Sequence, residues 1–97
     1  MKPSKAILEG MKKHPNAVPI RGEYYQRDAK GELTGACALG FALSSERLPP
    51  LAPYWRGECP VCKVKQSGGL PDLIVHLNDE HSLLPEVTAK HLEEMGL

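Results

Sequence analysis

The sequence predicts a small α+β domain. Two observations indicate the class: apolar residues recur at helical spacing near both ends of the chain, and a strand–turn–strand pattern lies between residues 24 and 34. A third observation concerns stability. The 97 residues include one Trp, one Phe and three Tyr against nine Gly and nine Pro. A chain of this length buries only about 60–65% of the surface it exposes when unfolded, so a stabilising element beyond packing is expected.

Residues 1–47 are predicted to form an amino-terminal helix, a hairpin and a second helix. Ser4 is the predicted N-cap of the first helix, and Pro15 closes that helix because the residue before a proline resists helical geometry. The predicted apolar face of the first helix consists of Ile7, Leu8 and Met11.

The hairpin is predicted from strands at 24–27 and 32–34, with a turn at 28–31 in which Gly31 takes a positive φ. Tyr24 and Tyr25 cannot both face inward in one strand, so one is expected in the core and the other on the surface. Residues 35–45 are predicted to form the second helix.

Residues 48–57 are predicted to be an extended, Pro-rich connector, with Trp55 packing on the unit that follows. Residues 58–97 are predicted to form a finger-like ββα unit, with a strand at 63–65, and a closing helix that begins at Pro85. The two parts together are expected to make one compact domain. The predicted apolar side of the closing helix consists of Leu84, Val87, His91, Leu92 and Met95.

Four potential metal ligands occur in the second part of the chain. Cys59 and Cys62 are separated by two residues, a spacing at which a tight turn brings two thiolates to one tetrahedral ion. His76 follows after thirteen residues and His81 after four more, with Leu73 where two-Cys, two-His fingers place a core leucine. The spacing predicts one bound zinc ion.

The step between the histidines constrains the helix that carries them. On a regular α-helix two residues five apart diverge by about 140°, so the helix must tighten or unwind near Asn78 and Asp79. Four strong ligands fill a tetrahedral shell, whereas a catalytic zinc keeps one position open. The ion is therefore predicted to be structural, and no enzymatic activity is expected.

A redox role is the alternative interpretation of the two cysteines. The segment "CPVC" is similar to the CPxC motif of glutaredoxin-like proteins. That chemistry requires the motif to follow a strand and open a helix. Here Pro-rich chain precedes the motif and a predicted strand follows it, which favours the metal.

Sequence-specific reading of DNA by the finger-like helix is not expected. The positions that contact bases in such fingers fall at Gly69, Asp72 and Val75, which offer almost no base-reading chemistry. Non-specific contact with nucleic acid remains an alternative function, because residues 1–30 carry seven basic side chains against three acidic ones. These basic residues are Lys2, Lys5, Lys12, Lys13, Arg21, Arg27 and Lys30.

With these motifs in hand, the chain resembles a group of small phage and bacterial proteins. The resemblance rests on "GACALG" at 35–40, "CPVC" at 59–62 and "HLNDEH" at 76–81, followed by a helix near Pro85. Relatives often carry an aromatic residue where this chain has Leu83, and isoleucine where it has Thr88. The resemblance implies a metal-bound fold and a phage-related setting, and it brings no established activity.

Two further side chains could carry chemistry. Cys37 lies at a predicted helix start, where the helix dipole would lower its pKa and favour a thiolate. A thiol enzyme would also need a base, for which the sequence offers His14 or His91; a buried, inert cysteine is the favoured interpretation. His91 is an alternative metal ligand.

The sequence therefore predicts a non-enzymatic interaction module with one structural zinc ion and a protein partner. A weak nucleic-acid binder is the second hypothesis, and a thiol or redox enzyme using Cys37 or the "CPVC" pair is the third. No signal peptide or membrane span is recognised, and a reducing cytoplasm suits the thiols. In a phage this would be the host cytoplasm.

Overall fold

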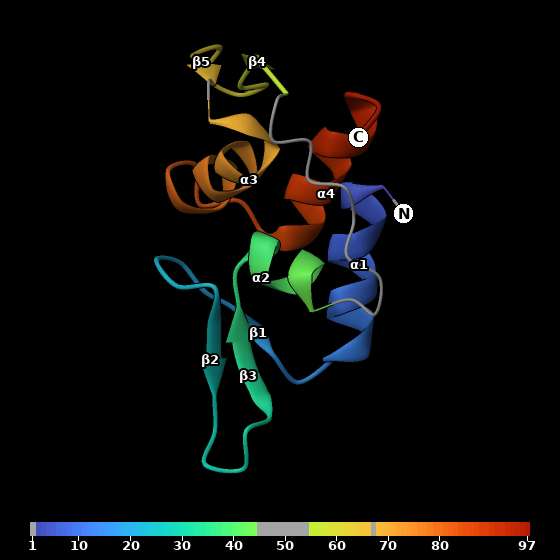
Figure 1. Cartoon of the computed structure of the whole chain (residues 1–97), viewed down its shortest axis with the longest axis vertical. Helices are drawn as coiled ribbons and strands as arrows, with labels where there is room; N and C mark the ends of the chain where they lie inside the picture. Colours follow the sequence, from blue (N-terminus) through green and yellow to red (C-terminus); the bar gives the residue numbers. More distant parts are fainter. Residues whose placement is uncertain (1, 45–54, 67) are drawn as a thin grey trace.

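Four helices surround one apolar core, with a three-stranded sheet at one end of the molecule and a two-stranded ribbon at the other (Figure 1).

The computed structural model describes residues 2–44, 55–66 and 68–97, and all statements on structure concern these. The α+β class agrees with the prediction. The predicted connector falls outside the described residues over 48–54. The elements are α1 (Pro3–Lys13), β1 (Val18–Pro19), β2 (Tyr25–Arg27), β3 (Leu33–Ala36), α2 (Ala38–Leu43), β4 (Gly57–Glu58), β5 (Lys65–Gln66), α3 (Gly69–Asp79) and α4 (Pro85–Glu94).

The core joins apolar side chains from both halves of the sequence. Helix α1 packs against α2 and α4, and α2 also contacts α3. The largest apolar side chains that are fully buried are Phe41, Ile7, Leu70, Leu73, Ile74, Leu77 and Leu92. Leu73, predicted to lie beneath the metal site, has an exposed fraction of 0%.

Helix α1 is rotated relative to the predicted face. Ile7 is buried as expected, whereas Leu8 is 44% exposed and Gly10 is buried instead. Gly10 allows α2 to come close: a Cβ atom at this position would lie 1.9 Å from the carbonyl oxygen of Phe41. The helix begins at Pro3 with Lys2 as its N-cap, so the prediction for Ser4 is wrong. Ser4 is buried.

The two chain ends lie side by side (Figure 1). The backbone N–H of Ser4 donates to the carbonyl oxygen of Leu97 at 3.3 Å. This hydrogen bond satisfies one of the amide groups that the first turn of α1 cannot satisfy within the helix.

The sheet has the order β1–β3–β2. β2 and β3 are antiparallel, as expected for the hairpin, and Gly31 in their turn has φ of 81°. β1 pairs in parallel with β3 and was not predicted, since two residues that include a proline give no strand pattern. Tyr24 is 53% exposed and Tyr25 is half-buried beneath the guanidinium of Arg27, so the expected difference between the tyrosines is confirmed.

Helix α2 is shorter than predicted. Gly35 and Ala36 belong to β3, and the helix begins at Ala38 with Cys37 as its N-cap. Gly35 pairs with Val18 on one side and Gln26 on the other. This pairing on both sides holds the segment in extended form despite its helical spacing of apolar residues.

Helix α4 begins at Pro85 as predicted, but its buried face is rotated. Leu84 and Val87 are 51% and 37% exposed, whereas Thr88 and Ala89 are buried. These smaller side chains let α4 lie against α1 and α2. The hydroxyl of Thr88 is fully buried and has no hydrogen-bond partner among the described residues, an unfavourable arrangement for a polar group.

Asn78 joins α3 to the amino-terminal half of the chain. Its Oδ1 accepts from the backbone N–H of Ala38 at 3.0 Å, at the first residue of α2. Its Nδ2 donates to the carbonyl oxygen of Ile20 at 3.0 Å and to Oδ1 of Asp79 at 2.7 Å. The side chain is only 2% exposed, so water does not replace these partners.

No helix in the described part of the chain has the length and apolar character needed to cross a bilayer.

Replacing Asn78 by alanine is expected to lower the free energy of unfolding by about 2–4 kcal/mol, because the amide of Ala38 and the carbonyl of Ile20 would lose a buried partner. Chemical denaturation of the zinc-loaded protein measures this. The control is Asn16→Ala at an exposed asparagine, which should change stability by less than about 0.5 kcal/mol. Equal stability of the two variants would contradict the role given to Asn78.

Candidate metal centre

The two cysteines lie in a tight loop between β4 and β5. These strands pair antiparallel, Gly57 with Gln66 and Glu58 with Lys65. Inside the loop the N–H of Cys59 donates to Val64 O, and the N–H of Lys63 donates to Cys59 O, both at 2.9 Å. The amide of Val61 donates to Sγ of Cys59 at 3.4 Å. The backbone thus turns both thiols to one side and stabilises one of the sulfurs.

The prediction of a strand at 63–65 is wrong, because residues 63 and 64 belong to this loop. β5 is Lys65–Gln66, and Lys63 has a positive φ of 65°. A residue at that φ cannot continue a strand, and the reversal of chain direction is what brings Cys62 back toward Cys59.

The histidines lie at the carboxyl end of α3. The helix ends at Asp79, and Glu80 N–H still donates to His76 O at 2.9 Å. The N–H of His81 donates to the same oxygen at 3.4 Å, which widens the last turn. Ser82 then adopts a φ of 53° and turns the chain away. The step of five residues from His76 to His81 predicts a change of helical geometry, and the widened last turn of α3 is that change.

The four ligand atoms converge on one point. They all lie within 4.8 Å of one another. Sγ of Cys59 lies 3.4 Å from Nε2 of His81, and Sγ of Cys62 lies 3.4 Å from Nε2 of His76. The two Nε2 atoms are 3.1 Å apart, with the rings nearly perpendicular at 87°.

These separations can be compared with the edges of a zinc tetrahedron. Bonds of about 2.3 Å to sulfur and 2.0–2.1 Å to nitrogen, at tetrahedral angles, require edges of about 3.5 Å for S–N and 3.3 Å for N–N. The distances of 3.4, 3.4 and 3.1 Å lie within a few tenths of an ångström of these values. The donor set and these three separations are consistent with one zinc ion held by the four side chains.

The surroundings of the four ligands are unequal. Cys59 is fully buried and belongs to the core cluster, both histidines are half-buried, and Cys62 is exposed. The half-buried indole of Trp55 lies over Gly57 at the base of the loop, as expected for a residue that packs on this unit. One side of the centre is therefore anchored to the core, and the other faces solvent.

The alternative uses of these residues find less support. The "CPVC" segment lies in a turn between two strands and does not open a helix, as a redox motif would. Among the described residues, the group of convergent ligand atoms does not include His91, which is half-buried on α4. Of the positions that read bases in a finger, Gly69 is buried and Val75 packs against the core.

Cys37 lies at the start of α2 as predicted, but its thiol is not activated there. It is 2% exposed, and Sγ accepts from the amide of Gly40 at 3.3 Å. Burial raises the pKa of Cys37, and the nearby carboxylate of Asp79 adds to the increase, although hydrogen bonds from the backbone amides of Gly40 and Leu39 oppose it. The expectation of a lowered pKa is wrong because loss of hydration exceeds the stabilisation from a helix of only six residues.

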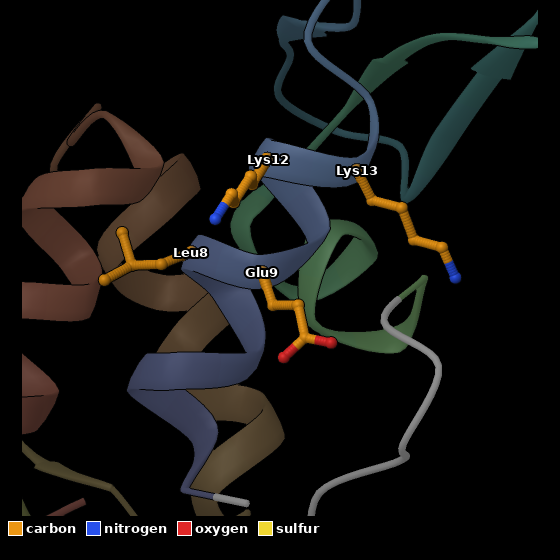
Figure 2. A pocket seen from close by; sticks show the side chains of 4 residues that line it. All are labelled: Leu8, Glu9, Lys12 and Lys13. Atoms are coloured by element: carbon orange, nitrogen blue, oxygen red, sulfur yellow. The ribbon is translucent and has the colours of Figure 1, made fainter.

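The described surface also has hollows away from the metal ligands. One of 480 Å³ is lined by Leu8, Glu9, Lys12 and Lys13 of α1. Figure 2 shows the two lysines leaving the last turn of the helix in opposite directions, with Glu9 one turn earlier. Another, of 340 Å³, lies between the start of β2 and α3 and is lined by Cys37 and Asp79 among others. The first hollow has charges of both signs, whereas the charged side chains that line the second, Glu23 and Asp79, are both acidic.

The sequence did not indicate how two residues position the site, although it predicts a change of helical geometry near Asn78. Asn78 lies between the two histidine ligands, and its partners Ala38 and Ile20 are 40 and 58 residues away, so no local pattern could reveal it. Lys63 directly follows the second cysteine. The tight-turn requirement of a CxxC site was the signal for a positive φ there, but lysine rather than glycine occupies the position.

Comparisons with known proteins give no relative for this fold or site. No family model, no curated protein and no solved structure matches the chain.

Lys63→Val is expected to destabilise the zinc-loaded protein by about 1–2 kcal/mol, because a β-branched residue is strained at a positive φ. Lys63→Gly should be as stable as the natural protein or slightly more so. Chemical denaturation measures both. Lys65→Val is the matched control, since it removes the same charge from an exposed position within β5 and should change stability by less than about 0.5 kcal/mol. Equal effects at the two positions would refute the conformational explanation.

Cys37 is expected to react with iodoacetamide at neutral pH at least about tenfold more slowly in the folded, zinc-loaded protein than in the unfolded chain. The raised pKa keeps the thiol of Cys37 protonated at neutral pH. Its contribution to the free energy of unfolding is fully present below the pKa of the unfolded chain, and it is lost as the pH rises through the pKa of the folded protein. Peptide mapping after timed alkylation measures the rate. Labelling at the unfolded rate would restore the hypothesis of a reactive thiol.

Proposed function

We propose that this protein is an interaction module whose carboxy-terminal half is ordered by one structural zinc ion, in a finger-like ββα arrangement. The observation that carries the proposal is the convergence of Cys59, Cys62, His76 and His81, whose ligand atoms lie within 4.8 Å of one another. Zinc binding to such sites is worth about 10–16 kcal/mol, comparable with the total stability of a small domain. The ion is the stabilising element that the small apolar core lacks.

The partner that we favour is a protein. The exposed side of the zinc loop carries two apolar side chains, Val61 at 45% and Val64 at 58% exposure, beside the exposed Lys63 and Lys65. Exposed apolar side chains surrounded by polar ones suit a protein contact. They cannot stack on bases as aromatic side chains do. By its resemblance to small phage and bacterial proteins, we place this module in a phage-related, cytoplasmic setting.

Weak, non-specific binding of nucleic acid is the second candidate. One observation favours it: all seven basic residues of the amino-terminal part, within residues 2–30, are exposed. They are spread over α1, the loop before β2, and the hairpin, and the two lysines in Figure 2 point apart. A steep fall in affinity for mixed DNA and RNA with rising salt would favour this candidate over a protein partner.

We infer that the module is not an enzyme. Four protein ligands leave no coordination position for water or substrate, which a catalytic zinc requires. The remaining thiol, Cys37, is buried and has a raised pKa. These features argue against catalysis by the metal and against the hypothesis of a thiol enzyme that uses Cys37.

Protein purified without added metal is expected to contain one zinc ion per chain, and chelation should unfold its carboxy-terminal half. Cys62→Ser and His76→Ala should have the same effect, because ligand binding and folding are coupled in small metal sites. Elemental analysis and amide NMR spectra measure metal content and order. His91→Ala is the control: it alters a histidine outside the cluster and should keep the ion. A metal-free variant with a dispersed, native-like spectrum would overturn the structural role.

A further inference from the structure

The two cysteine ligands differ strongly in exposure although only two residues separate them. Cys59 is 0% exposed and packs in the core, whereas Cys62 lies on the surface. A zinc-bound cysteine is held as a thiolate, the form that reacts with oxidants. Small oxidants can therefore reach the sulfur of Cys62, whereas the sulfur of Cys59 is buried and protected.

The same loop places the second sulfur close enough to complete an oxidation. The two Sγ atoms lie within 4.8 Å of each other, and a disulfide bond is about 2 Å long. The loop between them is exposed at Val61, and Lys63 at its end has a φ that is unfavourable for its residue type. Closing this distance requires the exposed residues of this loop to move toward the buried Cys59.

We propose that Cys62 is an oxidation site for hydrogen peroxide and that Cys59 resolves it as a disulfide, which releases the zinc ion. This inference rests on the zinc site of the proposed function and adds a means of regulating it. It differs from the "CPVC" redox hypothesis, since the cysteine pair here is oxidised once and does not catalyse exchange.

The reaction balances in two steps. The Cys62 thiolate attacks one oxygen of hydrogen peroxide, the O–O bond breaks, hydroxide leaves, and the sulfur becomes a sulfenic acid. The Cys59 thiolate then attacks this sulfur, the S–S bond forms, and a second hydroxide leaves. The two sulfurs together lose two electrons, which reduce the peroxide. Zinc has then lost two of its four ligands, and His76 and His81 alone cannot hold it in a closed tetrahedral shell.

Loss of the zinc ion would affect more of the molecule than the loop that holds the two cysteines. His76 and His81 flank Asn78 and Asp79, which bond to Ile20, Gly22 and Ala38 in the amino-terminal half. Loss of the ion removes the constraint on this end of α3. Oxidation is therefore expected to loosen the carboxy-terminal half and its contact with the sheet.

The test treats full-length, zinc-loaded protein with hydrogen peroxide. Released zinc is followed by the absorbance of its complex with 4-(2-pyridylazo)resorcinol, and peptide mapping locates the oxidised residues. Zinc release equimolar with a disulfide between Cys59 and Cys62, reversed by dithiothreitol and added zinc, is the expected result. Cys37, which is buried, should remain a thiol through the same treatment.

Cys62→His is the informative variant, because histidine can replace the ligand but cannot form a disulfide. It should retain zinc and release it at least about tenfold more slowly under peroxide. If this variant does not bind zinc, peptide mapping of the peroxide-treated natural protein decides whether the disulfide between Cys59 and Cys62 forms. Zinc that stays bound through the treatment, or release with Cys62 oxidised further and no disulfide, would overturn the inference and leave the zinc site standing. Absence of zinc before treatment would overturn both.

Discussion

The carboxyl end of α3 contacts two sets of neighbours at once, and these contacts connect the candidate metal centre to the amino-terminal half of the chain. On one side, Nε2 atoms of His76 and His81 face the two cysteine sulfurs at 3.4 Å. On the other, Asn78 and Asp79 hold the backbone of residues 20–22 and the first residue of α2. A metal ion that fixes the histidines therefore also fixes the position of the helix end against the amino-terminal half.

This arrangement helps to explain how a chain with only five aromatic residues, one Trp, one Phe and three Tyr, can hold a defined shape. Helices α1, α2 and α4 come together through small residues: Gly10 lies against the backbone of Phe41, and Ala89 is buried on α4. Close approach brings many atoms into van der Waals contact. The buried, unpartnered hydroxyl of Thr88 shows that this packing is not optimal. The strong, localised contribution of the proposed zinc ion would offset such deficits.

The proposed function and the proposed oxidation follow from one asymmetry of the centre. Its buried side, at Cys59, transmits the ion's constraint to the core, while its exposed side carries Cys62, Val61 and Val64. A surface ordered in this way can present a fixed face to a partner. The same exposure makes its order dependent on the oxidation state of one accessible sulfur.

The α+β class, the hairpin turn at Gly31, the start of α4 at Pro85 and the convergence of the four ligands could be predicted from the sequence, because each depends on residue type and local spacing. Which helix faces are buried could not be predicted in this way: Leu8, Leu84 and Val87 are exposed because smaller residues permit closer helix contacts. The tertiary structure also decided that Gly35 and Ala36 extend a strand, that burial raises the pKa of Cys37, and that Asn78 joins the two halves. These outcomes depend on partners distant in the sequence, whose positions no local pattern encodes.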